Sequence, residues 1–227
     1  MLGTSKEKCQ RHQKNPLENG TKKTEKNLKT KTMSSRAQIL EKIKQNQPEQ
    51  LSALPDLSVL GLEAFDILEK YKTILKSIGG DFVEVPSYDA IIDFVKQNFA
   101  TDKRMITTVP ELAEIATIDW FNSDPHSLED VELTIVKAHF GVAENSALWV
   151  TDDILGQRVA TFIPQYLAII LNKKDIVATM HQAYERIGNQ EYGFGTFIAG
   201  PSKTADIEQS LVLGAHGARG LTVFLME

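Results

Sequence analysis

The sequence predicts an α/β domain in which a mostly parallel sheet is flanked by helices. Along residues 81–227, short apolar segments of strand type alternate with segments whose apolar residues recur at helical spacing. Residues 166–171 are apolar throughout, which is typical of a strand buried on both faces of a parallel sheet. With 227 residues, 42% of them hydrophobic and 24% charged, the chain has the composition of a globular protein, and we expect one α/β domain.

The elements before the first strand are two predicted helices. Ser34 or Ser35 can cap the first helix with its side-chain hydroxyl. The second helix covers residues 62–78 and ends where two glycines follow. We therefore expect residues 33–80 to be an N-terminal helical extension that packs on a domain formed by residues 81–227.

The remaining elements alternate in type along the chain. Strands are expected at 81–85, 104–108, 131–136, 147–150, 166–171, 196–199 and 221–226, and helices at 90–99, 111–116, 176–187 and 205–213. Strands that alternate with helices indicate crossover connections and hence a parallel sheet covered by helices.

Residues 1–32 form a basic tail. They hold nine Lys or Arg and three Glu, a formal charge of +6, which leaves 16 basic and 27 acidic residues, a charge of −11, in residues 33–227. The tail has few large aliphatic residues to bury, so we expect disorder. Either the natural start is Met33 and the tail is extra translated sequence, or the tail is a functional basic arm. Because the acidic body repels phosphate, we expect no nucleic-acid partner.

The single cysteine, Cys9, lies in this tail, so the body has no thiolate for a disulfide, a Cys-ligated zinc site or an iron–sulfur cluster. His126, His139 and His181 lack the spacing of metal ligands, and we expect neither a metal nor a cofactor in this chain. No stretch approaches roughly 18 consecutive apolar residues. We therefore expect no membrane span and a cytoplasmic location.

A glycine-containing loop at residues 200–204, Gly-Pro-Ser-Lys-Thr, joins a predicted strand to the predicted helix 205–213. Free backbone amides at the start of that helix, together with the ammonium group of Lys203, favour a small carboxylate or phosphate. The alternative is plain helix capping by Thr204, with Asp206 supplying negative charge to the first turn.

Two side chains are candidates for catalysis. Glu144 follows small and apolar residues, so it is either presented in a cleft or a structural carboxylate that holds backbone amides. His216 lies where the predicted helix ends and is either an acid–base group or a histidine that interacts with the helix dipole. Asp152-Asp153 is interpreted as a solvated turn.

The loop at 200–204 leaves the carboxyl end of its predicted strand, whereas the loop containing His216 enters the next strand from the opposite end. His216 therefore need not face Ser202. The candidate ligand-binding residues are Asn145, Gly200, Pro201, Ser202, Lys203, Thr204, Asp206, Gly214 and Gly217.

The run of residues 197–208 and the Gly-Ala-His-Gly run at 214–217 resemble the C-terminal signature of the lactate utilization protein C (LUD domain, YkgG-type) family. Residues 140–145 are similar to that family's Phe-Gly-Ile-Ala-Glu-Thr segment. The family continues with a Thr-Gly-Thr-like turn, from which Asn145-Ser146-Ala147 departs. The resemblance covers roughly residues 35–227.

The resemblance implies the NagB/RpiA/CoA-transferase-like fold, which sugar-phosphate isomerases and CoA-transferases share. It also implies an accessory, cluster-free subunit of a three-protein system that oxidises L-lactate to pyruvate. The two partner subunits of such a system resemble iron–sulfur oxidoreductases and carry the clusters. A body without cysteine fits the third subunit, whose own catalysis the resemblance leaves open.

Two other functions stay open. Residues 143–145 are similar to the Ser-Glu-Asn-Gly motif of class I CoA-transferases, in which the glutamate is the nucleophile. The chain could thus be a stand-alone CoA-transferase-like or isomerase-like enzyme that acts on a small carboxylate or phosphate ester through Glu144. The other function is that of a regulatory subunit that binds a small molecule without catalysis.

Overall fold

The computed structural model of the chain describes residues 34–48, 65–205 and 211–227. Two compact units, residues 1–61 and 62–227, divide the chain. In the first unit, helix α1 (Ser35–Gln45) begins as predicted, because the Ser34 side chain accepts a hydrogen bond from the amide of Ala37. The basic tail predicted at 1–32 lies outside the described residues, and the division at residue 80 stays a prediction.

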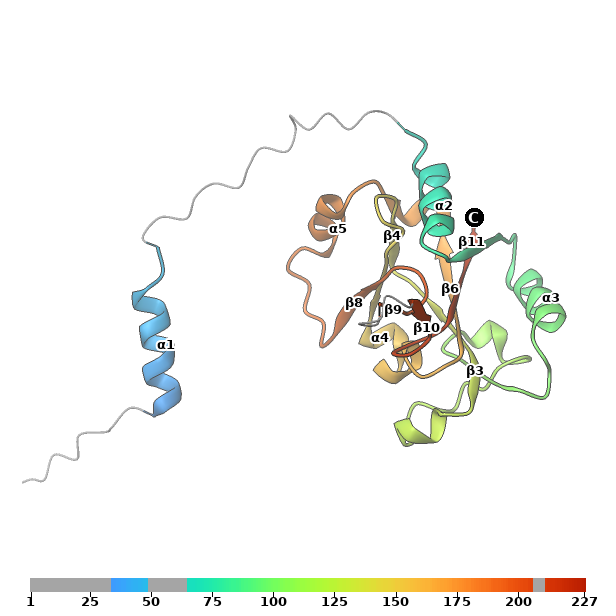
Figure 1. The fold of residues 1–227 in the computed structure, drawn as a ribbon, viewed down its shortest axis with the longest axis horizontal. Coiled ribbons are helices and arrows are strands. Elements are labelled where there is room, and N and C mark those ends of the chain that lie inside the picture. Colours follow the sequence, from blue (N-terminus) through green and yellow to red (C-terminus); the bar gives the residue numbers. More distant parts are fainter. Residues whose placement is uncertain (1–33, 49–64, 206–210) are drawn as a thin grey trace, which may run out of the picture. The chain divides into compact units, whose positions relative to one another are not determined.

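The second unit is built on a parallel sheet of five strands in the order β1-β11-β6-β3-β2. Figure 1 labels its central strands β11, β6 and β3. The bounds of the five strands are Asp81–Glu84 for β1, Arg104–Thr107 for β2, Val131–Lys137 for β3, Tyr166–Asn172 for β6 and Gly220–Met226 for β11. The five inner residues of β6 are buried, as the apolar run predicted. The α/β class and the parallel sheet are confirmed.

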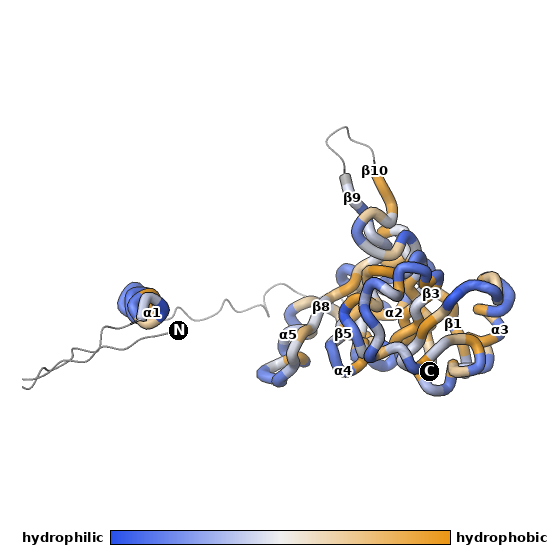
Figure 2. Tube along the Cα trace, turned by 90° about the horizontal axis from the view of Figure 1, so that it is seen from below, coloured by the Kyte–Doolittle hydropathy of each residue, from blue (hydrophilic) through white to orange (hydrophobic). Residues whose placement is uncertain are grey.

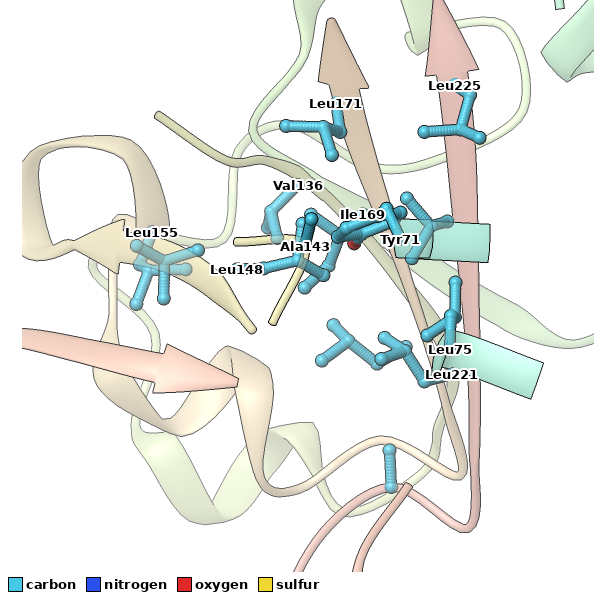
Figure 3. Close-up of a cluster of buried hydrophobic side chains, with 14 residues drawn as sticks. Tyr71, Leu75, Val136, Ala143, Leu148, Leu155, Ile169, Leu171, Leu221 and Leu225 are labelled. Atoms are coloured by element: carbon cyan, nitrogen blue, oxygen red, sulfur yellow. The ribbon is translucent and has the colours of Figure 1, made fainter. Parts of the chain in front are cut away.

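Alternate residues of the central strands point into two separate cores, because side chains of a strand face opposite sides of the sheet. Ile169 and Leu171 join the core that contains Tyr71 and Leu75 of helix α2 (Ile67–Ser77), which Figure 3 shows. On the other face, residues such as Ile170 join the core that contains helix α3 (Tyr88–Asn98). The sheet therefore has a helix against each face.

A second sheet covers part of the α2 side. It runs β7-β4-β5-β8, with bounds Ile176–Val177, Phe140–Val142, Leu148–Thr151 and Gly195–Ile198. The β4–β5 and β5–β8 pairs are antiparallel. In β5, Leu148 and Val150 enter the α2 core, whereas Trp149 packs on the opposite side with helix α5 (Met180–Ile187). The sequence predicted two of these strands but not a separate sheet.

The predicted helix at 205–213 is wrong in its described residues. Strands β9 (Lys203–Ala205) and β10 (Leu211–Leu213) form an antiparallel pair, which projects from the domain in Figure 2. Leu211-Val212-Leu213 is a continuous apolar run with a β-branched residue at its centre, a pattern that suits a strand better than one helical face. Residues 206–210, including Asp206, lie outside the described residues.

Two further predictions need correction. The helix expected at 111–116 is a short 3-10 helix followed by a turn, and Asp152 begins a helix rather than a solvated turn. The remaining short elements are η2 (Pro110–Leu112), η3 (Pro125–Leu128), α4 (Asp152–Leu155), η4 (Arg158–Thr161) and η5 (Lys173–Asp175). In the described part of the chain, every helix is too short or too polar to cross a membrane.

Candidate functional site

The loop at 200–203 connects β8 to β9 and lies against the end of α2. Gly200 has a φ of +74°, and a Cβ built there would lie 3.1 Å from the carbonyl oxygen of Ile78. Both the left-handed backbone and the close approach require glycine at this position. Pro201 is buried beside it. The backbone of this loop is therefore held in one conformation by its contact with α2.

The loop at 214–218 lies directly beside it. The amide of Ser202 donates a hydrogen bond to the carbonyl of Ala218 at 2.8 Å, and its carbonyl accepts one from the amide of Gly214 at 3.1 Å. A Cβ on Gly217 would lie 3.3 Å from the Cβ of Ser202. The two glycine-containing runs that stand out in the sequence thus form one structural unit.

This arrangement corrects the expectation that His216 need not face the Ser202 loop. That expectation assumed that β8 and β11 belong to one parallel sheet. However, β8 lies in the second sheet, and Ser202, which follows it, is hydrogen-bonded to Ala218 just before β11 begins. His216 and Ser202 consequently line the same pocket.

We call this cavity the Lys203 pocket. It has a volume of about 300 Å³, and its lining includes six residues that the sequence singled out. These are Gly200, Pro201, Ser202, Lys203, His216 and Gly217. A second cavity of about 430 Å³ adjoins it, shares Phe162, His216 and Gly217 with it, and is also lined by Gly214. Thr204 lies in β9 opposite Val212 and is not among the lining residues.

The ionisable groups that line the Lys203 pocket in the described part of the chain are one ammonium and one imidazole, with no carboxylate. Lys203 forms no salt bridge with another described residue. Its Nζ would lie 3.4 Å from a Cβ at Gly79, just beyond the end of α2. The carbonyl end of a helix favours such a cation, so Lys203 also has a structural neighbour there.

The sequence predicted two sources of anion affinity, free amides at the start of a helix and the ammonium group of Lys203. The first is wrong, and the second stays a prediction. Thr204 lies in strand β9 and the Ser202 amide is already hydrogen-bonded, so neither residue supplies a free helix amide to the site. Ser202, Lys203 and His216 still line one cavity. Any anion selectivity must come from these side chains.

Glu144 lies at a different place. Its carboxylate accepts a hydrogen bond from the amide of Met180 at 2.8 Å, at the first turn of α5. A carboxylate at a helix N-terminus is favourable and matches the structural alternative for this residue. The side chain is exposed and is not among the lining residues of either cavity described above.

The residues after Glu144 form a tight turn. The Asn145 side chain accepts a hydrogen bond from the Ala147 amide at 3.0 Å. Ser146 has a φ of +56°, and its buried hydroxyl donates to the carbonyl of Tyr71 at 2.8 Å. A left-handed backbone at Ser146 is strained for a residue other than glycine. In this chain the hydroxyl offsets part of the strain.

Nine lining residues of the Lys203 pocket were not predicted, among them Thr161, Phe162 and Thr196. Thr161 and Phe162 come from η4 and the turn after it, and Phe162 is 49% exposed. Thr196 comes from β8. No spacing in the sequence connects them with the glycine-containing loops, because only the placement of β8 and η4 brings them together.

Residues 34–48, 65–205 and 211–227 contain no candidate metal site. In these ranges no three His, Cys, Asp or Glu side chains are grouped so that they could hold an ion. His216 lines the pocket with lysine and hydroxyl groups instead, which is a set that suits an anion.

Comparison with known proteins connects this geometry to a family. Residues 68–226 match the LUD domain. The chain is 36% identical to lactate utilization protein C of Shouchella clausii over 108 residues, which are 43% of this chain and 47% of that protein. It thus aligns with about half the length of that relative. Over 219 residues it is 25% identical to lactate utilization protein C of Exiguobacterium, covering 82% of this chain and 93% of the relative.

Two further similarities agree with the LUD domain match and with the two relatives above. The chain is 30% identical to the protein YkgG of Escherichia coli K12 over 95 residues, 39% of this chain and 41% of that protein. Among solved structures, a DUF162 family protein from Deinococcus radiodurans superposes with a TM-score of 0.55 at 16% identity. That match covers 71% of this chain and 96% of the other, and it concerns the fold alone.

Proposed function

This chain belongs to the LUD domain family, and from that membership we propose that it takes part in lactate utilization as an accessory subunit without an iron–sulfur cluster of its own. Several relatives carry the name lactate utilization protein C, including one aligned over 93% of its length. The body of the chain contributes no cysteine, so the electron-carrying clusters belong to partner subunits.

The observation that carries the proposal is the Lys203 pocket, for which we infer a small carboxylate as ligand. Its volume of about 300 Å³ suits a small organic acid. Lys203 and His216 can both donate hydrogen bonds to a carboxylate, and no lining carboxylate among the described residues opposes the charge. Lactate and pyruvate are acids of this size. A phosphate group is also negatively charged and can be bound by the same side chains.

The role of a stand-alone transferase or isomerase has less support. A nucleophilic glutamate needs a substrate cavity beside its carboxylate. Glu144 is exposed, and one of its two carboxylate oxygens already accepts a hydrogen bond from the Met180 amide. A carboxylate in this position holds the start of α5, which is a structural task.

Calorimetric titration of the full chain with L-lactate, pyruvate, inorganic phosphate and acetyl-CoA tests the ligand proposal. Lys203→Ala removes one charge-assisted hydrogen bond worth roughly 1.5–3 kcal/mol, so affinity should fall by about ten- to a hundredfold. Lys103→Ala is the matched control, because Lys103 is exposed and lines neither cavity described above. Equal affinity of wild type and Lys203→Ala for every anion would remove the pocket from the proposal.

The partner proposal needs its own experiment. Purification of the tagged chain from its native cell should recover two cysteine-rich partner proteins, with iron in the assembly. Recovery of the chain by itself from lactate-grown cells would contradict the role of a subunit, whatever the titration shows.

A further inference from the structure

Three polar side chains next to the β4–β5 hairpin form a hydrogen-bonded chain that the proposed function does not use. His139 precedes β4, Thr151 ends β5, and Asp153 lies in α4. The His139 Nε2 lies 2.5 Å from the Thr151 hydroxyl oxygen, and this hydroxyl donates to the carboxylate of Asp153. The antiparallel register, with Phe140 opposite Trp149, is what brings His139 beside Thr151.

The positions of the protons in this row of hydrogen bonds follow from counting donors and acceptors. Thr151 has one hydroxyl proton, and Asp153 can only accept while it is ionised. The bond to Asp153 uses that proton, so the Thr151 oxygen must accept from Nε2–H of His139. The neutral imidazole then carries its proton on Nε2, and Nδ1 is an acceptor that has no partner among the described residues. His139 thus presents a base nitrogen of defined tautomer.

These groups line a cavity of about 520 Å³, which we call the His139 pocket. Its aromatic wall consists of Trp149 and Tyr192, whose rings meet edge to face with centroids 5.3 Å apart. Tyr192 is 45% exposed, whereas Trp149 is 6% exposed. The cavity therefore combines a polar side with an apolar side, whose accessible ring surface belongs mainly to Tyr192.

The charge of this cavity is negative. Asp152, Asp153 and Glu191 all line it. Arg158 neutralises Asp152 through two hydrogen bonds, at 3.1 and 3.0 Å. No Lys or Arg in the described part of the chain pairs with Asp153 or Glu191. The hydrogen bond from Thr151 holds the pKa of Asp153 below its ordinary value, so this carboxylate stays ionised at neutral pH.

We propose that the His139 pocket is a second ligand site, which takes a small ammonium compound carrying a flat apolar group. An ammonium group has three N–H donors, which can serve Nδ1 of His139, the free oxygen of Asp153 and the carboxylate of Glu191. The flat group packs against Trp149 and Tyr192. A carboxylate ligand meets two uncompensated negative charges here and is rejected.

Benzylammonium and benzoate are matched probes, because they share a ring and carry opposite charges. The full chain, labelled with ¹⁵N, is titrated with each while the two tryptophan indole N–H signals are followed. Trp149 lines the cavity, whereas the indole of Trp120 is buried and donates to the carbonyl of Thr107. Benzylammonium should move the Trp149 signal and leave the Trp120 signal in place, and benzoate should move neither.

Two variants test which carboxylates bind the ammonium group. Asp153→Asn should weaken benzylammonium binding by about tenfold, since it replaces an ionic hydrogen bond with a neutral one. Glu191→Gln should weaken it by a smaller factor, and this residue is exposed, so the variant leaves the fold unchanged. Lys203→Ala is the control and should bind benzylammonium like the wild type. The proposal is overturned if benzylammonium fails to move the Trp149 signal, if benzoate moves it equally, or if both carboxylate variants bind as tightly as the wild type.

The tautomer provides a readout that does not need the ligand. Nitrogen NMR of histidine-labelled protein at pH 8 should show the His139 proton on Nε2. Thr151→Val, which keeps the side-chain volume, should remove this preference. A proton on Nδ1 in the wild type would contradict the hydrogen-bond chain and with it the acceptor assigned to the ligand.

Discussion

The Lys203 pocket and the His139 pocket each contain one histidine, but they are opposite in charge. In the first, His216 lines the cavity together with an ammonium group and no described carboxylate. In the second, His139 lies among three carboxylates, one of which is neutralised by Arg158. The net charge of −5 for the whole chain therefore predicts neither site. The neighbours of each histidine decide which ligand charge it can accept.

The two cavities also differ in construction. The Lys203 pocket depends on backbone, because Gly200 and Gly217 allow two loops to lie in contact. The His139 pocket depends on side chains that project from the β4–β5 pair and from α4. The two nevertheless meet at one point: Phe197 lines the Lys203 pocket, and its ring centroid lies 4.7 Å from that of Trp149.

The largest expected effect comes from Trp149→Ala. Removal of a buried indole from the cluster with Phe140 and Phe197 should lower the free energy of unfolding by about 3–5 kcal/mol. Because Phe197 loses its support, ligand binding should weaken in both pockets. Tyr192→Ala is the comparison: it should affect the His139 pocket alone. Urea unfolding and titration with benzylammonium and lactate measure these changes, and unaltered lactate binding in Trp149→Ala would show that the pockets are independent.

The backbone of the Lys203 pocket is tested by Gly200→Ala. A Cβ on a residue with a φ of +74°, 3.1 Å from the Ile78 carbonyl, should cost about 1–3 kcal/mol of stability. Lactate affinity should fall with it, while benzylammonium affinity stays at the wild-type value. Ser202→Ala keeps the backbone and should cost less than about 1 kcal/mol. If Gly200→Ala binds lactate normally, the loop geometry is not needed for the site.

The hydrogen-bond chain of the His139 pocket is tested by Thr151→Val at two pH values. The depressed pKa of Asp153 means that its ionised form stabilises the folded state above the pKa of the unfolded chain, and that this contribution is lost as pH falls through the folded value. At pH 7 the variant should be less stable by about 1 kcal/mol, a value reduced by solvent exposure of the carboxylate. Below about pH 4 the difference should shrink. A difference that is the same at pH 7 and pH 3 contradicts the role of Asp153.

The smallest effect is expected for Glu144→Gln, which belongs to neither pocket. Loss of one negative charge at the start of α5 should cost about 0.3–1 kcal/mol. Affinities for lactate and for benzylammonium should both remain unchanged. A CoA-transfer assay serves as the second measurement: an activity that the wild type has and Glu144→Gln lacks would favour the stand-alone enzyme instead.

Several features of this chain could be predicted because their signals are local. The apolar run of β6 and the helical spacing of α2 and α3 each extend over six or more residues, long enough for a period to be recognised. The two glycine-containing runs also stood out, since left-handed backbone such as that of Gly200 restricts the residue type.

The sequence by itself therefore determined the α/β class and the buried central strand, and it singled out six of the residues that line the Lys203 pocket. Only the tertiary structure decided that β8 pairs with β5, that β9 and β10 pair antiparallel, and that His139 lies beside Thr151. Strands of three or four residues carry too short an alternation to predict their partner, whether that partner is near in sequence, as for β9 and β10, or distant, as for β5 and β8. The His139 pocket therefore has no recognisable motif in the sequence. Its charge and the tautomer of His139 depend on neighbouring residues that strand pairing brings together.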